Sequence, residues 1–408
     1  MHYLTAKPRI TIDVGPLFED QWTGIPVFTR RLIQSLMRHG GVHVEFCYNL
    51  TTIPHEAVFA AIQAVSGAFL RTDFERRAGQ DYPLVETAGH VLYPSVKEGF
   101  EIWAHEASTV HDLSTLVMPE NHDQANVDHH MRHLARELQS DEVVFCVSEA
   151  TREALCLAYP SSRSKARILY QYVDWPDHFE TIERHLPPVA LGRYAAVIGT
   201  VEPRKNLTLL IDALPLPAIK NSDLKFIVIG KIGWKVDKFL AGLAPRERQH
   251  LIFSGFVTEF IKYRFLKHAE FLVFPSMYEG FGIPALEAMS LGKPVLAAMS
   301  SSFPEVIGDA GVYFDPLSTT DFVEALREIS SPEKLAELKP KAIAGAAAFN
   351  WQRMAQPVVE WLHGRLAGGH LMEGNILTTP NRTLWSRQNW RRDGRRASRS
   401  RDRNAANC

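Results

Sequence analysis

The sequence predicts an α/β protein of two doubly wound, Rossmann-like domains that face each other across a crevice. Three observations support this prediction. The chain has 408 residues, short apolar strands alternate with amphipathic helices along most of it, and a polar, proline-bounded segment interrupts the alternation near the middle. Continuous apolar strands such as Phe226–Gly230 are typical of a parallel sheet that helices cover on both faces.

The first predicted domain covers residues 1–175. A strand at Arg9–Val14 leads into a loop, and apolar residues at helical spacing then predict a helix over Phe28–Met37. Ala57–Leu70 is the most apolar helical segment and is expected to form one core helix. Ser148 is a suitable N-cap for a helix over Glu149–Ala158. The other predicted strands are Val42–Cys47, His90–Tyr93, Ser108–Val110 and Glu142–Val147.

The second predicted domain covers residues 191–348 and follows a linker at 176–190, within the polar segment Asp174–Pro188. The pattern from Ser302 to Glu305 is that of a capping box, so Glu305 is expected to be structural. The predicted strands are Tyr194–Ile198, Lys225–Ile229, Leu251–Phe253, Glu270–Phe274 and Pro294–Ala298, and the predicted helices are Leu207–Leu214, Glu259–His268, Pro284–Leu291 and Thr320–Ile329.

The charge distribution argues against nucleic-acid binding. The formal net charge is −1, but residues 381–408 contain nine arginines and only two aspartates, so the rest of the chain carries about −8. Such an acidic body offers no basic surface to a nucleic acid. Residues 367–408 lose apolar periodicity and are expected to form a disordered, solvated, Arg-rich tail.

The cysteines and the apolar segments indicate the compartment. Four cysteines fall at no disulfide or metal-ligand spacing, which is typical of reduced thiols in a cytosolic protein. No signal segment precedes the first strand, and no apolar run approaches the length of a membrane span. We therefore expect a cytoplasmic protein, with peripheral contact at the inner face of the membrane left open.

Residues 274–295, FPSMYEGFGIPALEAMSLGKPV, combine a strand end, a glycine loop and a helix start. Gly280 and Gly282 permit close backbone approach in the loop. The free N–H groups and the positive dipole end of the following helix make this an anion-binding site. Glu279 lies in the loop, and Glu287 lies about one turn into the helix.

A second anion-binding element follows the strand Tyr194–Ile198. In the segment EPRKN, Arg204 and Lys205 come just before Asn206, which is suited to cap the next helix. Fixed cations at such a place stabilise the negative charge that develops on a departing diphosphate. Arginine adds a bidentate fork and lysine a compact charge.

Together these residues resemble the signature of the retaining group 1 glycosyltransferases, which have the GT-B fold. The two glutamates match the E-x7-E pair of that family without a gap, and EPRKN resembles a variant common in bacterial surface-polysaccharide enzymes. The resemblance covers about residues 9–366. It implies that Glu279 lies beside the donor sugar and that Glu287 binds the ribose hydroxyls. The loop amides that would contact the donor belong to Gly280, Phe281, Gly282 and Ile283.

The first half of the chain resembles the family less closely. His111 and Asp112 look like the family's HD segment, so His111 is expected to reach the donor sugar or the reacting centre. Gly24 corresponds to the glycine that lets the first helix approach donor or acceptor. Pro26 departs from the family pattern, which leaves the acceptor side unassigned. The helix at 349–366 resembles the one that crosses back to the first domain.

The resemblance implies a hexosyltransferase that uses neither a metal nor a cofactor. The expected catalytic residues are Glu279, His111, Arg204 and Lys205. The expected reaction moves mannose from GDP-mannose, with retention of configuration, to a glycan or lipid-linked glycan in polysaccharide assembly, as in lipopolysaccharide or exopolysaccharide. A UDP-sugar such as UDP-glucose is the alternative donor. A GT-B sugar-nucleotide epimerase and a non-catalytic nucleotide-sugar-binding subunit are the alternative functions.

A metal enzyme or a dinucleotide enzyme finds less support in the residues. His129 and His133 stand one helical turn apart in a histidine-rich stretch, which is a spacing that zinc sites use. The sequence contains no HExxH motif, and no D-x-D pair follows an apolar strand. The first strand also opens no G-x-G-x-x-G fingerprint.

Overall fold

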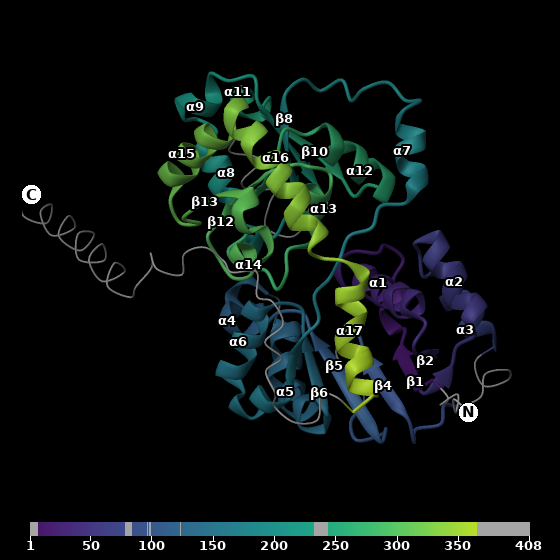
Figure 1. Cartoon of the computed structure of the whole chain (residues 1–408). Helices are drawn as coiled ribbons and strands as arrows, with labels where there is room; N and C mark the ends of the chain where they lie inside the picture. The colour runs from purple at the N-terminus through teal and green to yellow at the C-terminus, as the bar shows by residue number, and fades with distance from the viewer. Residues whose placement is uncertain are drawn as a thin grey trace, which may run out of the picture. The chain divides into compact units, whose positions relative to one another are not determined.

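The computed structural model describes residues 7–77, 84–95, 97, 99–122, 124–231 and 244–364 (Figure 1). Within these ranges the chain builds two separate β-sheets with helices on their faces, so the predicted α/β class with two Rossmann-like domains is confirmed. Both sheets belong to one compact unit, Met1–Leu366. The tail predicted at 367–408 lies outside the described residues.

The first sheet has seven strands in the order β3-β2-β1-β4-β5-β6-β7. Its neighbours run parallel except β2 and β3, which pair antiparallel. Ile12 lies opposite Phe46 on one side and Leu92 on the other, and all three side chains are fully buried. The strands are β1 (Arg9–Asp13), β2 (His43–Tyr48), β3 (Thr51–Thr52), β4 (His90–Tyr93), β5 (His105–Val110), β6 (Val143–Cys146) and β7 (Ala166–Ile168).

The second sheet has six parallel strands in the order β10-β9-β8-β11-β12-β13. The chain order therefore reverses between β8 and β11, and ligands bind at such a switch point, outside the carboxyl ends of the strands. The strands are β8 (Tyr194–Ile198), β9 (Lys225–Ile229), β10 (Leu251–Gly255), β11 (Leu272–Phe274), β12 (Val295–Ala298) and β13 (Gly311–Phe314).

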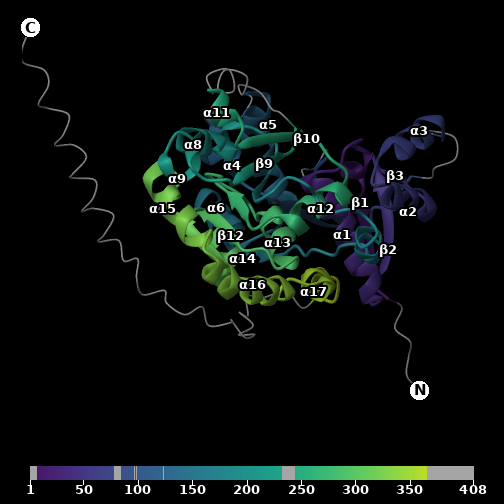
Figure 2. The same cartoon turned by 90° about the horizontal axis from the view of Figure 1, so that it is seen from above.

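Helices connect the strands and cover the sheets (Figures 1 and 2). The helices that precede β8 are α1 (Gly24–His39), α2 (His55–Ala64), α3 (Ala68–Arg77), α4 (Ser114–Val117), α5 (Gln124–Ser140), α6 (Glu149–Ala158) and α7 (Asp177–Glu183). Those that follow it are α8 (Leu207–Ala213), α9 (Pro217–Lys220), α11 (Pro245–Arg248), α12 (Glu259–His268), α13 (Ile283–Ser290), α14 (Phe303–Ile307), α15 (Thr319–Ile329), α16 (Pro332–Ala347) and α17 (Trp351–Leu362).

In the first half, one predicted helix is longer than expected and another prediction was wrong. Helix α1 begins at Gly24, four residues before the predicted start, because Pro26 occupies the first turn, where its missing N–H has no partner to lose. The single helix predicted over Ala57–Leu70 is two helices. Val65 takes a left-handed φ of 52° between them, and the N–H of Gly67 donates to the carbonyl of Glu19.

The predicted linker contains helix α7, which packs against α12. The carboxylate of Glu183 in α7 contacts Arg264 Nε at 2.5 Å and His268 Nε2 at 2.7 Å. The segment looked irregular because it is short and bounded by prolines. Its helix is stabilised by partners that lie some eighty residues away.

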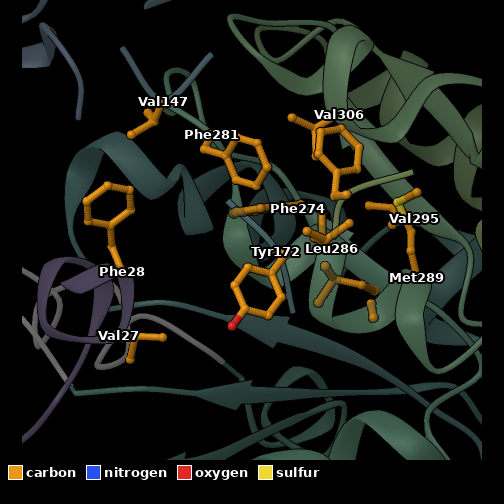
Figure 3. Close-up of a cluster of buried hydrophobic side chains, with 14 of the residues drawn as sticks. Val27, Phe28, Val147, Tyr172, Phe274, Phe281, Leu286, Met289, Val295 and Val306 are labelled. Carbon is orange, nitrogen blue, oxygen red and sulfur yellow. The ribbon is translucent and has the colours of Figure 1, made fainter. Parts of the chain in front are cut away.

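One hydrophobic core includes side chains from both sheets. Figure 3 shows Val27 and Phe28 of α1, Tyr172 of the connecting segment, Phe281 and Leu286 among the buried side chains of this core. The last helix, α17, lies beside α1 (Figure 1), while α16 before it packs on α13. After α16 the chain thus returns to α1 of the first domain. No helix of the described residues is both long and apolar enough to cross a membrane.

Candidate active site

Two loops of the second sheet meet at the switch point between β8 and β11. The first loop leads from β8 into a short 3-10 turn, η4 (Pro203–Lys205), and the second leads from β11 to α13. The N–H of Met277 in the second loop donates to the carbonyl of Arg204 in the first, at 2.9 Å. The predicted cations and the predicted glycine loop are therefore neighbours in space.

Glu279 is the centre of an ion network that joins the two loops. Lys205 Nζ lies 2.5 Å from its Oε1 and Arg204 Nη1 lies 3.3 Å from its Oε2. Arg204 also donates to the carbonyl of Tyr278 at 2.7 Å and to Glu202 at 2.8 Å. Arg204, Lys205 and Glu279 expose less than a fifth of their side chains, so water screens the network weakly.

The network holds Glu279 and Arg204 in their charged forms. Burial by itself raises the pKa of Glu279, but Lys205 and Arg204 outweigh it and hold that pKa below the ordinary value. Burial by itself lowers the pKa of Arg204, but the negative charges of Glu279, Asp112 and Glu202 outweigh it and raise that pKa above the ordinary value. The site therefore presents a fixed carboxylate between two fixed cations.

Gly280 docks the second loop onto the first sheet. Its carbonyl accepts hydrogen bonds from Ser148 Oγ at 2.5 Å and from Thr151 Oγ1 at 3.1 Å. A Cβ on Gly280 would lie 1.7 Å from the carbonyl oxygen of His111, so only glycine fits here. This close approach brings the loop next to the end of β5, where the predicted HD segment lies.

His111 is held as a neutral hydrogen-bonding group. Burial lowers its pKa, and its Nε2 lies 2.7 Å from the carbonyl oxygen of Pro94. A neutral ring that donates from Nε2 to this carbonyl keeps a lone pair on Nδ1. The Phe28 ring of α1 meets the imidazole edge to face, with 4.7 Å between ring centroids.

The predicted helix start forms at α13. Gly282 is its N-cap in the left-handed region, at a φ of 87°, and Ile283 is the first helical residue. The ring of Phe281 is buried in the core against Phe349, with 5.5 Å between centroids. Any contact of Phe281 with a ligand would therefore come from its backbone.

Glu287 is not part of the Glu279 network. Its side chain, in the second turn of α13, is 2% exposed and is bound by Lys262 Nζ at 2.7 Å. Arg31 of helix α1 approaches the same oxygen, Oε1, to 3.5 Å. The predicted pair of glutamates thus contacts two different sets of cations.

Gly24 is the first residue of α1 and lies in open space. A Cβ added to it would meet no atom within 4 Å. The glycine is therefore not required by packing within the described residues.

Glu305 has a structural role, as predicted, but the predicted capping box does not form. Ser302 does not cap its helix, because its Oγ donates to the carbonyl of Glu279 at 3.0 Å. Glu305 instead accepts the N–H groups of Glu149 and Ala150, at 2.8 and 3.2 Å, and so caps α6 of the first sheet. No local pattern could reveal this contact, since its partners are about 155 residues away.

Asn206 is a further correction. It takes a left-handed φ of 54° and makes no side-chain cap. Its amide Nδ2 donates to the carbonyl of Pro316 at 2.9 Å, so the residue ties the cation loop to the chain after β13.

A small cavity opens beside Lys205. Its volume is about 10 Å³, roughly the space of one water molecule. Gly199, at a φ of 148°, lets the lysine lie close, because a Cβ there would come within 3.3 Å of the Lys205 Cε. The cavity joins Lys205 to the loop after β11 and is lined by Gly199, Thr200, Val201, Phe274, Pro275 and Ser276 among others.

The described residues offer one group that could hold a metal ion: His90, His105 and Glu142. The two imidazoles stack with 4.3 Å between centroids and 14° between planes. A metal bound by both rings would have to lie in both ring planes, which nearly parallel rings do not allow. Of the two histidines predicted to share a helix face, the side chain of His129 lies outside the described residues.

Family and sequence comparisons point to one group of enzymes. The model of the family "Glycosyl transferases group 1" matches residues 180–344. Over 257 residues the chain is 31% identical to the O-antigen chain mannosyltransferase B of Escherichia coli, an alignment that covers 60% of this chain and 66% of that protein. It is 33% identical over 168 residues to the serotype-specific mannosyltransferase WbdA of Escherichia coli.

These alignments span less than two thirds of either relative. The WbdA alignment covers 40% of this chain and 21% of that protein. The range matched by the family model, residues 180–344, includes the second sheet and the loops that carry Arg204, Lys205 and both glutamates.

Solved structures share the fold. A sucrose-phosphate synthase from Thermosynechococcus elongatus superposes with a TM-score of 0.61 at 17% identity, over 88% of this chain and 99% of that one. WaaG, a glycosyltransferase involved in lipopolysaccharide biosynthesis, superposes with a TM-score of 0.59 at 17% identity, over 87% and 100%. The predicted GT-B architecture is thereby confirmed.

Proposed function

Because the chain belongs to the group 1 glycosyltransferase family, we propose that it transfers a hexose from a nucleotide-sugar donor to a glycan or lipid-linked glycan. One observation supports this above the others: Arg204 and Lys205 are fixed on Glu279 directly before the N-terminus of α13. Two cations beside a helix start suit a diphosphate better than any other common ligand group.

On this proposal the donor diphosphate lies between η4 and the start of α13. When the bond between the sugar's anomeric carbon and the diphosphate oxygen breaks, the electron pair moves to that oxygen. Arg204, Lys205 and the N–H groups of the helix start then stabilise the new charge. Because the cations are held by Glu279 beforehand, little reorganisation is needed when the bond breaks.

The acceptor hydroxyl would attack the face that the diphosphate leaves. Its oxygen forms the new bond to the anomeric carbon, and its proton passes to the departing diphosphate oxygen, so the configuration is retained. In this scheme the neutral imidazole of His111 and the carboxylate of Glu279 orient the sugar through hydrogen bonds. The low pKa of His111 supports the orienting role over proton transfer.

Glu287 is proposed to bind the ribose hydroxyls of the donor, and Gly24 to lie near the donor at the start of α1. A carboxylate accepts hydrogen bonds from both hydroxyls of a vicinal diol, which suits it to a ribose. Its contact with Lys262 does not prevent this, because an ammonium leaves other carboxylate lone pairs available.

We further propose that the donor is GDP-mannose and that the product belongs to a bacterial polysaccharide. The names of the two relatives, O-antigen chain mannosyltransferase B and serotype-specific mannosyltransferase WbdA, support mannose and a surface glycan. A lipid-linked acceptor would bring the enzyme to the cytoplasmic face of a membrane as a peripheral protein.

A panel of thermal-shift measurements tests the donor without knowledge of the acceptor. We expect GDP and GDP-mannose to raise the melting temperature by several degrees, and UDP and UDP-glucose to raise it much less. A larger increase in melting temperature with UDP-sugars would indicate that the donor is a UDP-sugar instead of GDP-mannose. No shift with any nucleotide sugar would overturn the proposed function.

Turnover separates the enzyme classes. With GDP-mannose and an acceptor extract, we expect GDP release that depends on the acceptor and a product with retained anomeric configuration by proton NMR. Isomerised donor without transfer would indicate an epimerase. Donor binding without any turnover would indicate a non-catalytic subunit.

A further inference from the structure

Helix α1 presents two consecutive buried arginines to helices of the second sheet. Arg30 forks onto Glu259 at the start of α12, with Nη1–Oε2 and Nη2–Oε1 distances of 3.0 and 2.7 Å. Arg31 approaches Glu287 of α13, with Nη2 at 3.5 Å from Oε1. The Arg31–Glu287 pair connects α1 to α13, the helix that begins at the glycine loop, and the Arg30–Glu259 pair connects α1 to α12.

The two arginines are satisfied to different degrees. Both terminal nitrogens of Arg30 are hydrogen-bonded, and Glu259 raises its pKa despite burial. Arg31 is 1% exposed, and none of its three guanidinium nitrogens has a hydrogen-bond partner. Burial lowers the pKa of Arg31. A buried cation held only by a long ion pair is costly, so its retention here requires a reason.

Glu287 does not need Arg31 for charge balance. Lys262 of α12 binds the carboxylate at the shorter distance of 2.7 Å. Lys262 is also anchored over the Trp175 ring, 5.6 Å from its centroid. The contribution specific to Arg31 is therefore to tie the orientation of Glu287 to helix α1.

We propose that Arg31 is a positioning residue for nucleotide binding, which acts through Glu287. Its guanidinium fixes the carboxylate so that the oxygens face the vicinal hydroxyls of a ribose, and it does so only while α1 lies close enough to α13 for this ion pair to form. This inference rests on the proposed function, since it takes Glu287 to be the ribose-binding residue. Arg31 lies on α1, so the first domain would also contribute to nucleotide binding.

The test measures the affinities of the wild type and of an Arg31 variant for two nucleotides by isothermal titration calorimetry. The four values form a double cycle, in which one change is made in the protein and the other in the ligand. The ligands are GDP and 2′,3′-dideoxy-GDP, which differ only in the ribose hydroxyls. We expect Arg31→Met to weaken GDP binding about tenfold and to change dideoxy-GDP binding less than twofold. A purely structural role predicts equal losses for both ligands, and that result would overturn the proposal, as would unchanged GDP binding.

Two further variants make the result interpretable. Arg38 lies on the same helix in an exposed ion pair with Asp174 at 2.8 Å, so Arg38→Met should bind both nucleotides like the wild type. If Arg31→Met does not fold, Arg31→Lys replaces it. Lysine keeps the positive charge but loses the planar guanidinium, so Arg31→Lys should weaken the binding of GDP more than that of dideoxy-GDP. If the affinities for the two nucleotides fall by the same factor, or if neither falls, the result counts against the proposal.

Failure of the proposed function gives a different result. If the wild type binds neither GDP nor UDP, the nucleotide-sugar proposal fails before Arg31 is tested. If it binds UDP in place of GDP, only the donor assignment fails. The same cycle with UDP and 2′,3′-dideoxy-UDP then tests Arg31.

Discussion

Lys205 and Glu279 are 74 residues apart in the chain, yet the ammonium of one lies 2.5 Å from the carboxylate of the other. Each residue lies in a loop that follows one of the two strands flanking the switch point of the second sheet. The fold therefore brings a cation and an anion together at the edge where it also places a helix N-terminus. On the proposed function, this pair holds the lysine ready for the diphosphate.

Replacing Lys205 with alanine should reduce kcat/KM for transfer at least a hundredfold. The loss corresponds to about 3 kcal/mol, the scale of one preorganised charge donor to a transition state. Steady-state GDP release measures the change. Lys220→Ala, an exposed lysine at the end of α9, is the control and should keep wild-type rates. Near-normal turnover of the Lys205 variant would remove the lysine from the mechanism.

Replacing Gly280 with alanine should both destabilise the protein and suppress transfer. The added Cβ would lie 1.7 Å from the backbone carbonyl of His111, and no side-chain rotation can relieve a clash with backbone. We expect a loss of about 1–3 kcal/mol in unfolding free energy. Urea denaturation measures it. Gly89→Ala, where a Cβ meets no atom within 4 Å, should be close to neutral.

The contribution of two buried carboxyl groups, Glu137 and Asp141, to the free energy of unfolding should fall as the pH rises from about 4 to 7. Burial, followed by repulsion from Asp141, raises the pKa of Glu137 to about 7, and burial raises that of Asp141 to about 6 despite its contact with Lys97. The ordinary values are 4.5 and 3.8. The folded chain thus retains protons that the unfolded chain releases in this window.

A glutamine at position 137 removes the larger of these two shifts. We expect Glu137→Gln to gain about 1–3 kcal/mol at pH 7.5 and nothing near pH 4, since the carboxyl is protonated in both states there. Melting curves across this pH range measure the difference. The exposed Glu153→Gln on α6 should not alter the profile, and an unchanged profile for Glu137→Gln would show that Glu137 does not carry the effect.

Glu305→Ala should destabilise the chain by about 0.5–2 kcal/mol, the usual scale of a lost N-cap. The carboxylate accepts two N–H groups at the start of α6 and a hydrogen bond from Tyr170 at 2.7 Å. Thermal unfolding measures the change. The exposed Glu324→Ala on α15 should be neutral. A neutral Glu305 variant would mean that water caps α6 equally well.

The sequence was informative wherever local chemistry decides the structure. Strand His90–Tyr93 and helix Glu149–Ala158 have the predicted bounds, because an apolar run and a capping serine define them locally. The loop with Glu279 and the turn with Arg204 and Lys205 were both placed at strand ends, so their meeting followed from the parallel fold.

Apart from the start of α1, which depends on the nearby Pro26, the errors share one physical cause: contacts between residues distant in the chain. Glu305 has the local pattern of a capping box, but it caps a helix of the other sheet. Arg31 was not singled out from the sequence, because only its contact with Glu287, some two hundred and fifty residues away, shows that it is buried beside that carboxylate. Gly67 breaks a predicted helix because its backbone packs against Phe18.

The central claim is that a nucleotide diphosphate binds between the Arg204–Lys205 turn and the start of α13. Calorimetric titration of the wild type and of Lys205→Ala with GDP and with guanosine tests it most directly. We predict that the wild type binds GDP at least a hundredfold more tightly than guanosine, and that the substitution removes most of this difference while leaving guanosine binding unchanged. Equal affinity of the wild type for GDP and guanosine, or full retention of the difference in the variant, would contradict the claim.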